Sequence, residues 1–354
     1  MTARRNSRAV GNADCGARGM RDRAAAILDE FAASTGLAAA GQPRRYLWTD
    51  AFAVMTWVGL HERTGEPRFL DLAERLVEQV HDVLGAHRED DAHPTARGLR
   101  IGKPLPERAP HEPYDRELEW DRDGQYYHYL TKWMQALRRM STATGDDRYH
   151  RWAAELARAA HRAFVHPKGM YWKMSVNLSR PLVPSMGAHD PLDGLVTMAH
   201  LGLTNEAREL ARICEGMRWA TSDALGAGGL LVDALRLARL VARGQQGLQQ
   251  LLAEVLHDAE ASAPAAAASL RGPASQRLAF RELGFALGLH AIEPLGKYAD
   301  TRALSPYVPL ARQLEDFWLD PASQSAETWT GHRDINAVTL AASLAPDGVL
   351  GELA

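Results

Sequence analysis

Cysteine, long apolar runs and any large excess of charge are all missing from this sequence, and each absence excludes a class of protein. Only two cysteines occur, Cys15 and Cys214, too few for a disulfide framework, so a reducing compartment is expected. No apolar stretch reaches the roughly 20 residues that a membrane-spanning helix needs, and residues 1–18 lack the apolar run of a signal peptide. We therefore expect a cytoplasmic protein with no membrane partner.

The balance of charge makes nucleic acid an unexpected partner. Lysine and arginine number 41 against 44 aspartates and glutamates, a formal net charge of -3, and the arginines alternate with acids. Binding along a phosphate backbone needs massed positive charge. Gly226, Gly228 and Gly229 lie in an Ala/Leu-rich helical pattern and not in a phosphate-binding loop, so the sequence predicts no cofactor.

Helical periodicity is the main positive signal. Residues 20–34 carry one apolar stripe and predict an outer helix, whereas residues 47–60 are apolar on all sides and predict a helix surrounded by protein. A half-exposed helix over residues 69–84 follows. Residues 1–18, rich in Arg, Gly and Asn, are expected to form a disordered leader, and residues 19–354 a single domain.

The same outer and inner helical unit recurs along the chain. Thr64 to Leu76 matches Thr144 to Leu156 when the two segments are aligned on their Thr-Gly turns, and weaker copies follow. The count reaches twelve helices, or six hairpins, with an outer helix first and an inner helix over residues 334–344 last. These two can pair and close a ring, so we predict an all-α protein, an (α/α)6 toroid of six helical hairpins.

Two insertions interrupt the helical repeats. Residues 85–118 are rich in proline, histidine and charge, and residues 170–183 alternate in polarity as a β-hairpin does. Long insertions of this kind usually decorate the functional rim of a domain.

Two segments resemble known carbohydrate-active proteins. Residues 46–69, Tyr-Leu-Trp-Thr-Asp-Ala-Phe through Thr-Gly-Glu-Pro-Arg-Phe, look like the opening hairpin of six-hairpin glycosidase-like proteins. Trp120 to His128, with Asp123-Gly124-Gln125 before the aromatics, is similar to the Arg-Gly-Gln-aromatic segment of the unsaturated glucuronyl hydrolases. The resemblance implies a toroid that acts on a small carbohydrate. Since Asp123 stands where that family has Arg, its uronate specificity does not carry over.

Polar and aromatic groups gather where four of the predicted inner helices begin, and in a toroid these starts converge on one basin. The clusters are Trp48 and Asp50; Trp120, Asp121, Asp123 and Gln125; His189, Asp190 and Asp193; and Trp329, His332, Arg333, Asp334 and Asn336. Acids at helix starts are also ordinary caps, and each tryptophan is equally a core residue, so only the set indicates a site.

Aromatic rings beside acids suit stacking against the apolar face of a sugar. The side chains that we expect to contact substrate are Trp48, Trp120, Gln125, Tyr127, His128, Trp329 and Arg333.

Glycoside cleavage needs two carboxyl groups roughly 5 to 10 Å apart. Asp50, Asp123, Asp190 and Asp334 are the candidates. Asp123 precedes a glycine and a predicted helix N-terminus, which favours its ionised form and predicts a base or water-positioning role. Because acids outnumber histidines at this rim, the sequence favours a glycoside hydrolase.

Two other functions stay open. A sugar epimerase or isomerase would move a proton from carbon and back with a pair of bases, for which His189 and His332 are the natural choice. A non-catalytic carbohydrate-binding or scaffolding ring would show aromatics without such a pair. The spacing of His189-Asp190 and His332-Arg333-Asp334 is unlike that of zinc ligands, so no metal site is predicted.

Overall fold

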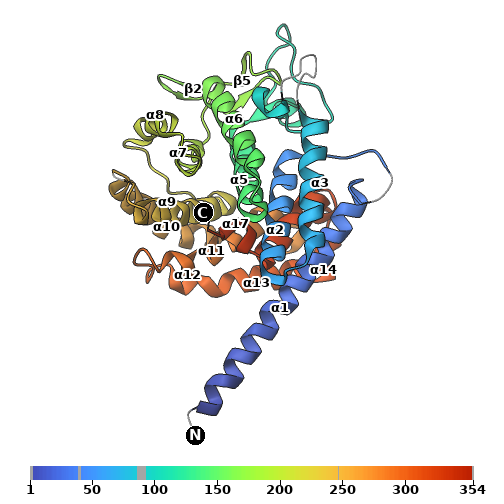
Figure 1. Ribbon diagram of the computed structural model, residues 1–354, viewed down its shortest axis with the longest axis vertical. Coiled ribbons are helices and arrows are strands. Elements are labelled where there is room, and N and C mark those ends of the chain that lie inside the picture. Colours follow the sequence, from blue (N-terminus) through green and yellow to red (C-terminus); the bar gives the residue numbers. More distant parts are fainter. Residues whose placement is uncertain (1–2, 39–40, 86–92, 246, 353–354) are drawn as a thin grey trace.

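Six helices stand side by side as an inner ring in the computed structural model, which describes residues 3–38, 41–85, 93–245 and 247–352 (Figure 1). Each inner helix packs against the next, and the last packs against the first. The inner helices are α2 (Leu47–Thr64), α5 (Tyr127–Thr144), α7 (Asp190–His200), α9 (Ala224–Ala242), α11 (Ala279–His290) and α16 (Arg333–Leu344). The ring is therefore closed.

A second layer of six helices surrounds this ring, each packed on one inner helix. The outer helices are α1 (Ala3–Ser34), α3 (Pro67–Leu84), α6 (Asp147–Phe164), α8 (Thr204–Cys214), α10 (Gln249–Ser269) and α13 (Val308–Leu319). The first helix, α1, pairs with the last inner helix, α16. The predicted (α/α)6 toroid, including its closure by the first and last helices, is confirmed.

The predicted leader coincides with the first part of α1. This helix was expected from Met20 but spans Ala3–Ser34, and its first part projects from the ring (Figure 1). Side chains are described only from Gly16 onward. The division into a leader over residues 1–18 and a domain over residues 19–354 stays a prediction.

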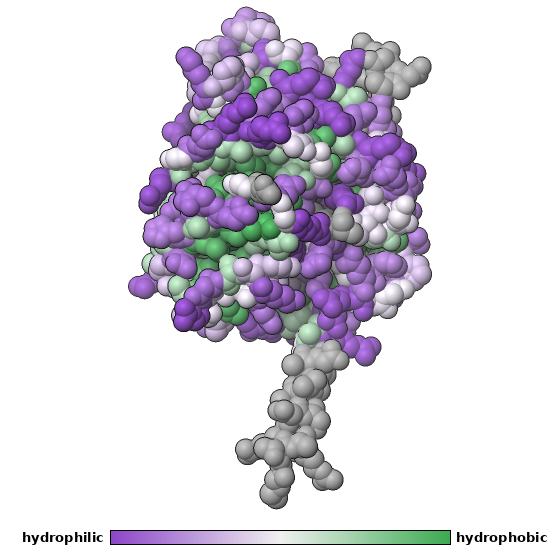
Figure 2. Space-filling view, turned by 60° about the vertical axis from the view of Figure 1, so that its left-hand side comes forward, coloured by the Kyte–Doolittle hydropathy of each residue, from purple (hydrophilic) through white to green (hydrophobic). Residues whose placement is uncertain are grey.

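The two layers differ in polarity as the periodicity predicts. In α2 every residue from Thr49 to Leu60 is buried, whereas α3 buries one stripe and exposes the other. On the face shown in Figure 2 hydrophilic residues dominate, with hydrophobic ones visible between them toward the middle. Among the described helices, none is both long and apolar enough to cross a membrane.

One end of the ring is plugged by the short helix α17 (Asp347–Leu350), which lies in the middle of the ring (Figure 1). It packs against α2, where a side chain at Gly348 would collide with the Met55 carbonyl. Gln135 and Arg139 of α5 donate to the carbonyl oxygens of Val349 and Glu352 at 3.0 and 2.8 Å. The plug leaves the opposite end, where the inner helices begin, for a site.

Short strands cover the start of α5. The first, β1 (Gln125–Tyr126), pairs antiparallel with β4 (Lys173–Met174), and β4 pairs antiparallel with β5 (Pro181–Val183). The predicted β-hairpin over residues 170–183 is therefore confirmed and gains a third strand. Another small hairpin joins β2 (Val165–His166) to β3 (Gly169–Met170).

The remaining elements are single turns in the connections. They are η1 (Pro94–Arg97), α4 (Arg116–Asp121), η2 (Ala274–Gln276), α12 (Ile292–Leu295), η3 (Ser305–Tyr307), α14 (Pro321–Gln324) and α15 (Glu327–Thr330). Both η1 and α4 belong to the first predicted insertion.

Trp57 tests the inner-layer assignment of α2. Its side chain is fully buried, and its ring lies 6.5 Å from that of Phe31 on α1. We expect Trp57→Ala to lower the free energy of unfolding by about 3 to 5 kcal/mol, because the indole leaves a cavity. Urea unfolding followed by circular dichroism measures this loss.

Trp57→Phe is the matched control for that variant. The indole nitrogen of Trp57 has no hydrogen-bond partner among the described residues, so the phenyl ring should retain most of the stability. An alanine variant that unfolds at the same urea concentration as the parent would contradict the placement of α2.

Candidate active site

His128 and Asp190 are the predicted site residues that the structure brings together. His128 lies in the first turn of α5 and Asp190 is the first residue of α7. The distance from His128 Nδ1 to Asp190 Oδ1 is 3.6 Å. Two neighbouring inner helices thus place an imidazole and a carboxyl group together at the open end of the ring.

Aromatic rings wall the imidazole of His128. The ring centre of Trp48 lies 5.9 Å away and that of Tyr126 5.4 Å away, the latter stacked on the imidazole. Tyr129 lies 5.3 Å from Trp48, and Trp172 lies 5.0 Å from Tyr126. The His128 side chain is nevertheless 26% exposed, so these rings leave part of the imidazole in contact with solvent.

Burial sets the protonation of this pair. Asp190 is only 6% exposed, and burial, followed by the nearby charge of Asp193, raises the pKa of Asp190 to about 7. Burial likewise lowers the pKa of His128 to about 4. Near pH 7 the imidazole is therefore neutral and a substantial fraction of Asp190 carries a proton that it can donate.

One polar atom of each member lacks a hydrogen-bond partner among the described residues, although the Asp190 carboxyl group also accepts from the backbone of Gly187. These atoms, His128 Nδ1 and Asp190 Oδ2, are both buried. A buried polar atom without a partner costs free energy, which a bound polar group can recover. The pair therefore keeps unused hydrogen-bonding capacity on both side chains.

Asp193, one turn further along α7, has the opposite electrostatic environment. Its carboxylate accepts from Thr131, from Lys132 Nζ at 2.9 Å and from Arg236 Nη1 at 3.0 Å. Burial alone would raise the pKa of Asp193, but Lys132 and Arg236 outweigh it and lower the pKa to about 2. Divergent carboxyl groups of this kind are typical of acid–base sites.

Asp123, the predicted catalytic base, is held by three hydrogen bonds in the loop before β1. It is 4% exposed, and its carboxylate binds Arg100 Nη1 at 2.7 Å and the backbone N–H groups of Gly102 and Gly124 at 3.1 and 2.9 Å. Residues 125–126 form β1, so α5 begins only at Tyr127. Asp123 therefore anchors a loop and does not lie at a helix N-terminus.

Asp50 is a structural cap. It is 1% exposed, accepts from the backbone N–H of Tyr46 at 2.9 Å and lies 3.3 Å from Arg45 Nη1. Burial raises the pKa of Asp50 to about 7.

Four predicted substrate contacts are also occupied within the fold. Gln125 is fully buried and donates to the carbonyls of Arg97 and Val176, and Tyr127 is fully buried. Trp329 is 5% exposed and stacks on Trp318. Arg333 pairs with Glu30 of α1 across the ring closure, although both side chains are 65% exposed.

The remaining predicted residues lie at the rim and stay accessible. His189 is half-buried, and its Nε2 lies 2.8 Å from the Trp219 carbonyl oxygen. His332 is exposed, and the Asp334 side chain is 38% exposed and 3.5 Å from Arg44. Trp120 is 49% exposed.

Several residues of the basin were not predicted. Tyr126 and Tyr129 belong to the same aromatic run as His128, whereas Trp172 reaches the wall from the β-hairpin insertion. Asp223 at the start of α9 pairs with Arg281 of α11. The aromatic run was a usable signal, but contacts from the insertion depend on its path through space.

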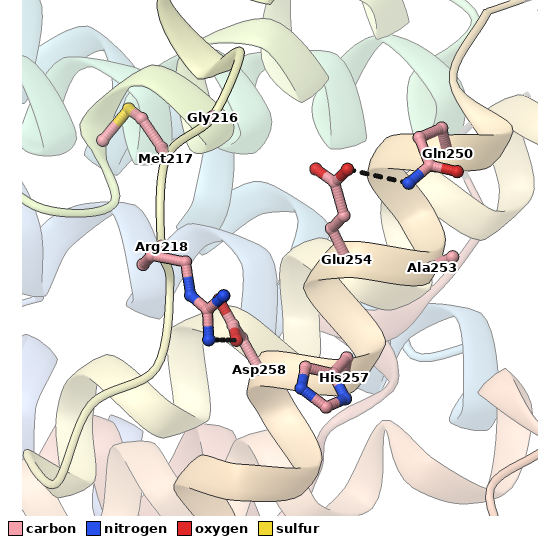
Figure 3. Close-up of a pocket in the computed structure, with 8 residues that line it drawn as sticks. All are labelled: Gly216, Met217, Arg218, Gln250, Ala253, Glu254, His257 and Asp258. Atoms are coloured by element: carbon pink, nitrogen blue, oxygen red, sulfur yellow. Dashed lines mark hydrogen bonds and ion pairs between the residues drawn. The ribbon is translucent and has the colours of Figure 1, made fainter.

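A separate hollow lies on the outer face of the ring, between the segment at residues 216–218 and α10 (Figure 3). Arg218 and Asp258 face one another across it at 3.7 Å, and Asp258 also accepts from the backbone N–H of Trp219 at 2.6 Å. None of the basin residues lines this hollow. Among the described residues, no group of three or more His, Cys, Asp or Glu side chains is arranged to hold a metal ion.

No family model and no curated protein matches the chain in sequence. Solved structures match its fold. A family 76 glycoside hydrolase, an α-mannanase from Bacteroides thetaiotaomicron, aligns with a TM-score of 0.61 at 10% identity, over 95% of this chain and 97% of that one. The cellobiose 2-epimerase of Spirochaeta thermophila aligns with a TM-score of 0.58 at 14% identity, over 91% and 96%.

A third similar structure is an inactive variant of an α-1,6-mannanase from Salegentibacter, in which two adjacent aspartates are replaced by asparagine, in complex with α-1,6-mannotriose. It has a TM-score of 0.55 and 13% identity, over 92% of this chain and 99% of that one. The chain thus shares the (α/α)6 toroid fold of these three structures.

Opposite effects of two substitutions on α7 test the electrostatics of the site. The folded-state pKa of Asp190, about 7 against an ordinary 3.8, means that its contribution to stability is present below pH 4 and is lost as the pH rises through 7. Asp190→Asn should therefore be more stable than the parent at pH 8, on the order of a few kcal/mol, and equal to it below pH 4.

Asp193→Asn is the matched comparison. Its pKa of about 2 means that its contribution is present above pH 4 and is lost as the pH falls through 2. This variant should lose on the order of 3 to 5 kcal/mol at pH 7, because Lys132 loses its anion and Arg236 keeps only Asp233. Urea titrations from pH 3 to 8 measure both, and effects of the same sign at pH 8 would contradict the assignment.

Proposed function

We propose that the protein is a carbohydrate-active enzyme, a glycoside hydrolase whose active site is the basin at the start of the inner helices. The observation that carries this proposal is the contact of Asp190 with His128 inside an aromatic wall. Glycoside cleavage needs a carboxylic acid that keeps its proton near neutral pH. The toroid neighbours that act on sugars support the same substrate class.

Asp190 acts as the general acid in this mechanism. Its proton passes to the glycosidic oxygen as the bond to the anomeric carbon breaks, and the leaving sugar departs as an alcohol. Neutral His128, 3.6 Å away, packs beside the carboxyl group and adds no charge that would remove its proton. Trp48, half-buried beside His128, offers a ring face to the apolar side of the sugar.

The second carboxyl group comes from another inner helix. Asp334 at the start of α16 and Asp223 before α9 have side chains that are 38% and 41% exposed. Each lies beside an arginine, Arg44 or Arg281, that keeps it oriented. One of them activates the water that attacks the anomeric carbon.

The arrangement of acids here departs from that of the Salegentibacter mannanase, which is inactive when two adjacent aspartates are replaced. Adjacent aspartates in this chain are Asp90-Asp91 and Asp146-Asp147. The first pair lies outside the described residues. The second pair is exposed at the start of the outer helix α6 and does not belong to an inner helix. We therefore assign the role of the general acid to Asp190.

Epimerisation is the second candidate, supported by the similarity to cellobiose 2-epimerases. That reaction removes a proton from carbon and returns one, which requires two bases. His189 and His332 are both accessible at the rim. Neither histidine is required to move a proton in hydrolysis.

Loss of the acid distinguishes an active-site role for Asp190 from a structural one. We expect Asp190→Asn to lower glycoside cleavage by about 100-fold or more, since general acid catalysis contributes on that order, while the folded protein is retained. The assay uses α-1,6-mannotriose, cellobiose and aryl glycosides. Asp147→Asn is the control, because this exposed carboxylate pairs with Arg151 on the same helix. Full turnover by Asp190→Asn would overturn the assignment.

Replacement of the rim histidines separates the two reactions. For hydrolysis, His189→Gln and His332→Gln should each lose only part of the activity. For epimerisation, each should lose on the order of 100-fold, because each histidine would move the proton at carbon. Deuterium exchange from solvent into reducing sugars, present in the parent and absent in both variants, would overturn the hydrolase proposal.

A further inference from the structure

Lys103 is a cation beside the basin that the reaction proposed above does not use. Its Nζ lies 5.7 Å from the ring centre of Tyr126 and 5.9 Å from that of Trp120. Within the described residues no carboxylate lies within ion-pair distance of it. We name Lys103 with the rings of Trp120, Tyr126 and Trp172 the lysine platform.

The backbone holds Lys103 in place. The neighbouring residue Gly102 donates its N–H to Asp123 at 3.1 Å, and the carbonyl of Ile101 accepts from the N–H of Leu47 at 3.0 Å. Gly102 has φ +96°, and a side chain there would collide with the Arg45 carbonyl. The loop is therefore fixed between the start of α2 and residues 123–124, so little backbone ordering remains to be done when a ligand binds.

Glu119, one of the acids whose charge acts on Lys103, is neutralised by other cations. Glu119 is bound by Lys173 Nζ at 2.9 Å and by Arg108 Nε at 3.0 Å. Lys173 is itself fully buried. Because Glu119 has two cationic partners, it leaves the charge of Lys103 available.

Two further acids face the platform. Asp123 is paired with Arg100 at 2.7 Å, and Asp121 is exposed to solvent, where its charge is screened. Burial, followed by the charge of Lys173, lowers the pKa of Lys103 to about 8. An ammonium group that has lost hydration without gaining a counter-ion is stabilised by an anion.

The platform adjoins the proposed catalytic pair. Tyr126 contacts Lys103 on one side and stacks on His128, 5.4 Å away, on the other. Trp172 lies 5.0 Å from Tyr126 and 4.9 Å from Trp120. Trp120 is 49% exposed, so a sugar stacked on its ring lies beside the Lys103 ammonium group.

We propose that Lys103 binds an anionic substituent of the carbohydrate, a carboxylate, a phosphate or a sulfate group, so that the enzyme prefers acidic sugars to neutral ones. The inference rests on the proposed function, because it assigns a specificity to the same basin. The shared chemistry of these groups is a negative charge with oxygen acceptors, which an ammonium group binds.

Binding measurements on the full chain test this preference. Isothermal titration calorimetry of Asp190→Asn, which prevents turnover, compares D-glucose with D-glucuronate, D-glucose 6-phosphate and D-glucose 6-sulfate. At least one anionic sugar should bind about 10-fold or more tightly than glucose, and the identity of that sugar distinguishes a carboxylate from the two esters. Added salt should reduce the preference.

Substitutions of Lys103 assign the preference to this residue. In the Asp190→Asn background, Lys103→Met should abolish the ratio of anionic to neutral affinity, whereas Lys103→Arg should retain most of it. Lys297→Met, an exposed lysine after α12, should leave the ratio unchanged. Circular dichroism melts confirm that each variant folds.

Other outcomes separate this inference from the function on which it rests. Equal affinity for neutral and anionic sugars, or a preference that survives Lys103→Met, would overturn the role of Lys103 and leave the hydrolase proposal intact. Failure of every sugar to bind, together with absence of glycoside cleavage in the parent, would overturn both.

Discussion

The centre of the ring depends on the ion pairs of the buried Asp193 carboxylate. This carboxylate lies on α7 and accepts from Lys132 of α5 at 2.9 Å and from Arg236 of α9 at 3.0 Å, so one anion connects three successive inner helices. These cations keep Asp193 ionised in spite of its burial. Its charge then helps to raise the pKa of Asp190, three residues earlier. The group that holds the helices together also sets the protonation of the proposed acid.

The two ends of the ring are unequal, and this inequality decides where chemistry can occur. At one end α17 packs against α2, and its backbone carbonyls accept hydrogen bonds from α5. At the other end the insertions reach the first turn of α5 and contribute Trp172 and Lys103 to the rim. The open end therefore combines rigid helix starts with loops of variable sequence, as functional sites commonly do.

The sequence was sufficient for the fold because the signal of each helix is repeated along many residues. The apolar run of α2 and the apolar stripe of α3 match the residues that these helices bury. Six helical hairpins repeat this pattern, so the copies support one another. The site depended on single residues instead. Asp123 and Asp50 are acids of the kind that catalyse glycoside cleavage. In the fold, however, Arg100 pairs with Asp123 and Arg45 pairs with Asp50. His128 and Asp190 were both candidates, yet only the packing of α5 beside α7 shows that they meet.

The reaction is defined at the helix starts and not by the ring. Buried residues such as Trp57 keep the toroid stable. The same fold occurs in a mannanase that is only 10% identical in sequence to this chain. The proposed acid and its histidine partner come from the first turns of two different helices, so either can change without disturbing the core below. One toroid can therefore support hydrolysis or epimerisation, depending on which few side chains occupy these turns. In this chain the turns place a carboxylic acid with a raised pKa against a neutral imidazole, and that pairing suits proton donation to a leaving oxygen.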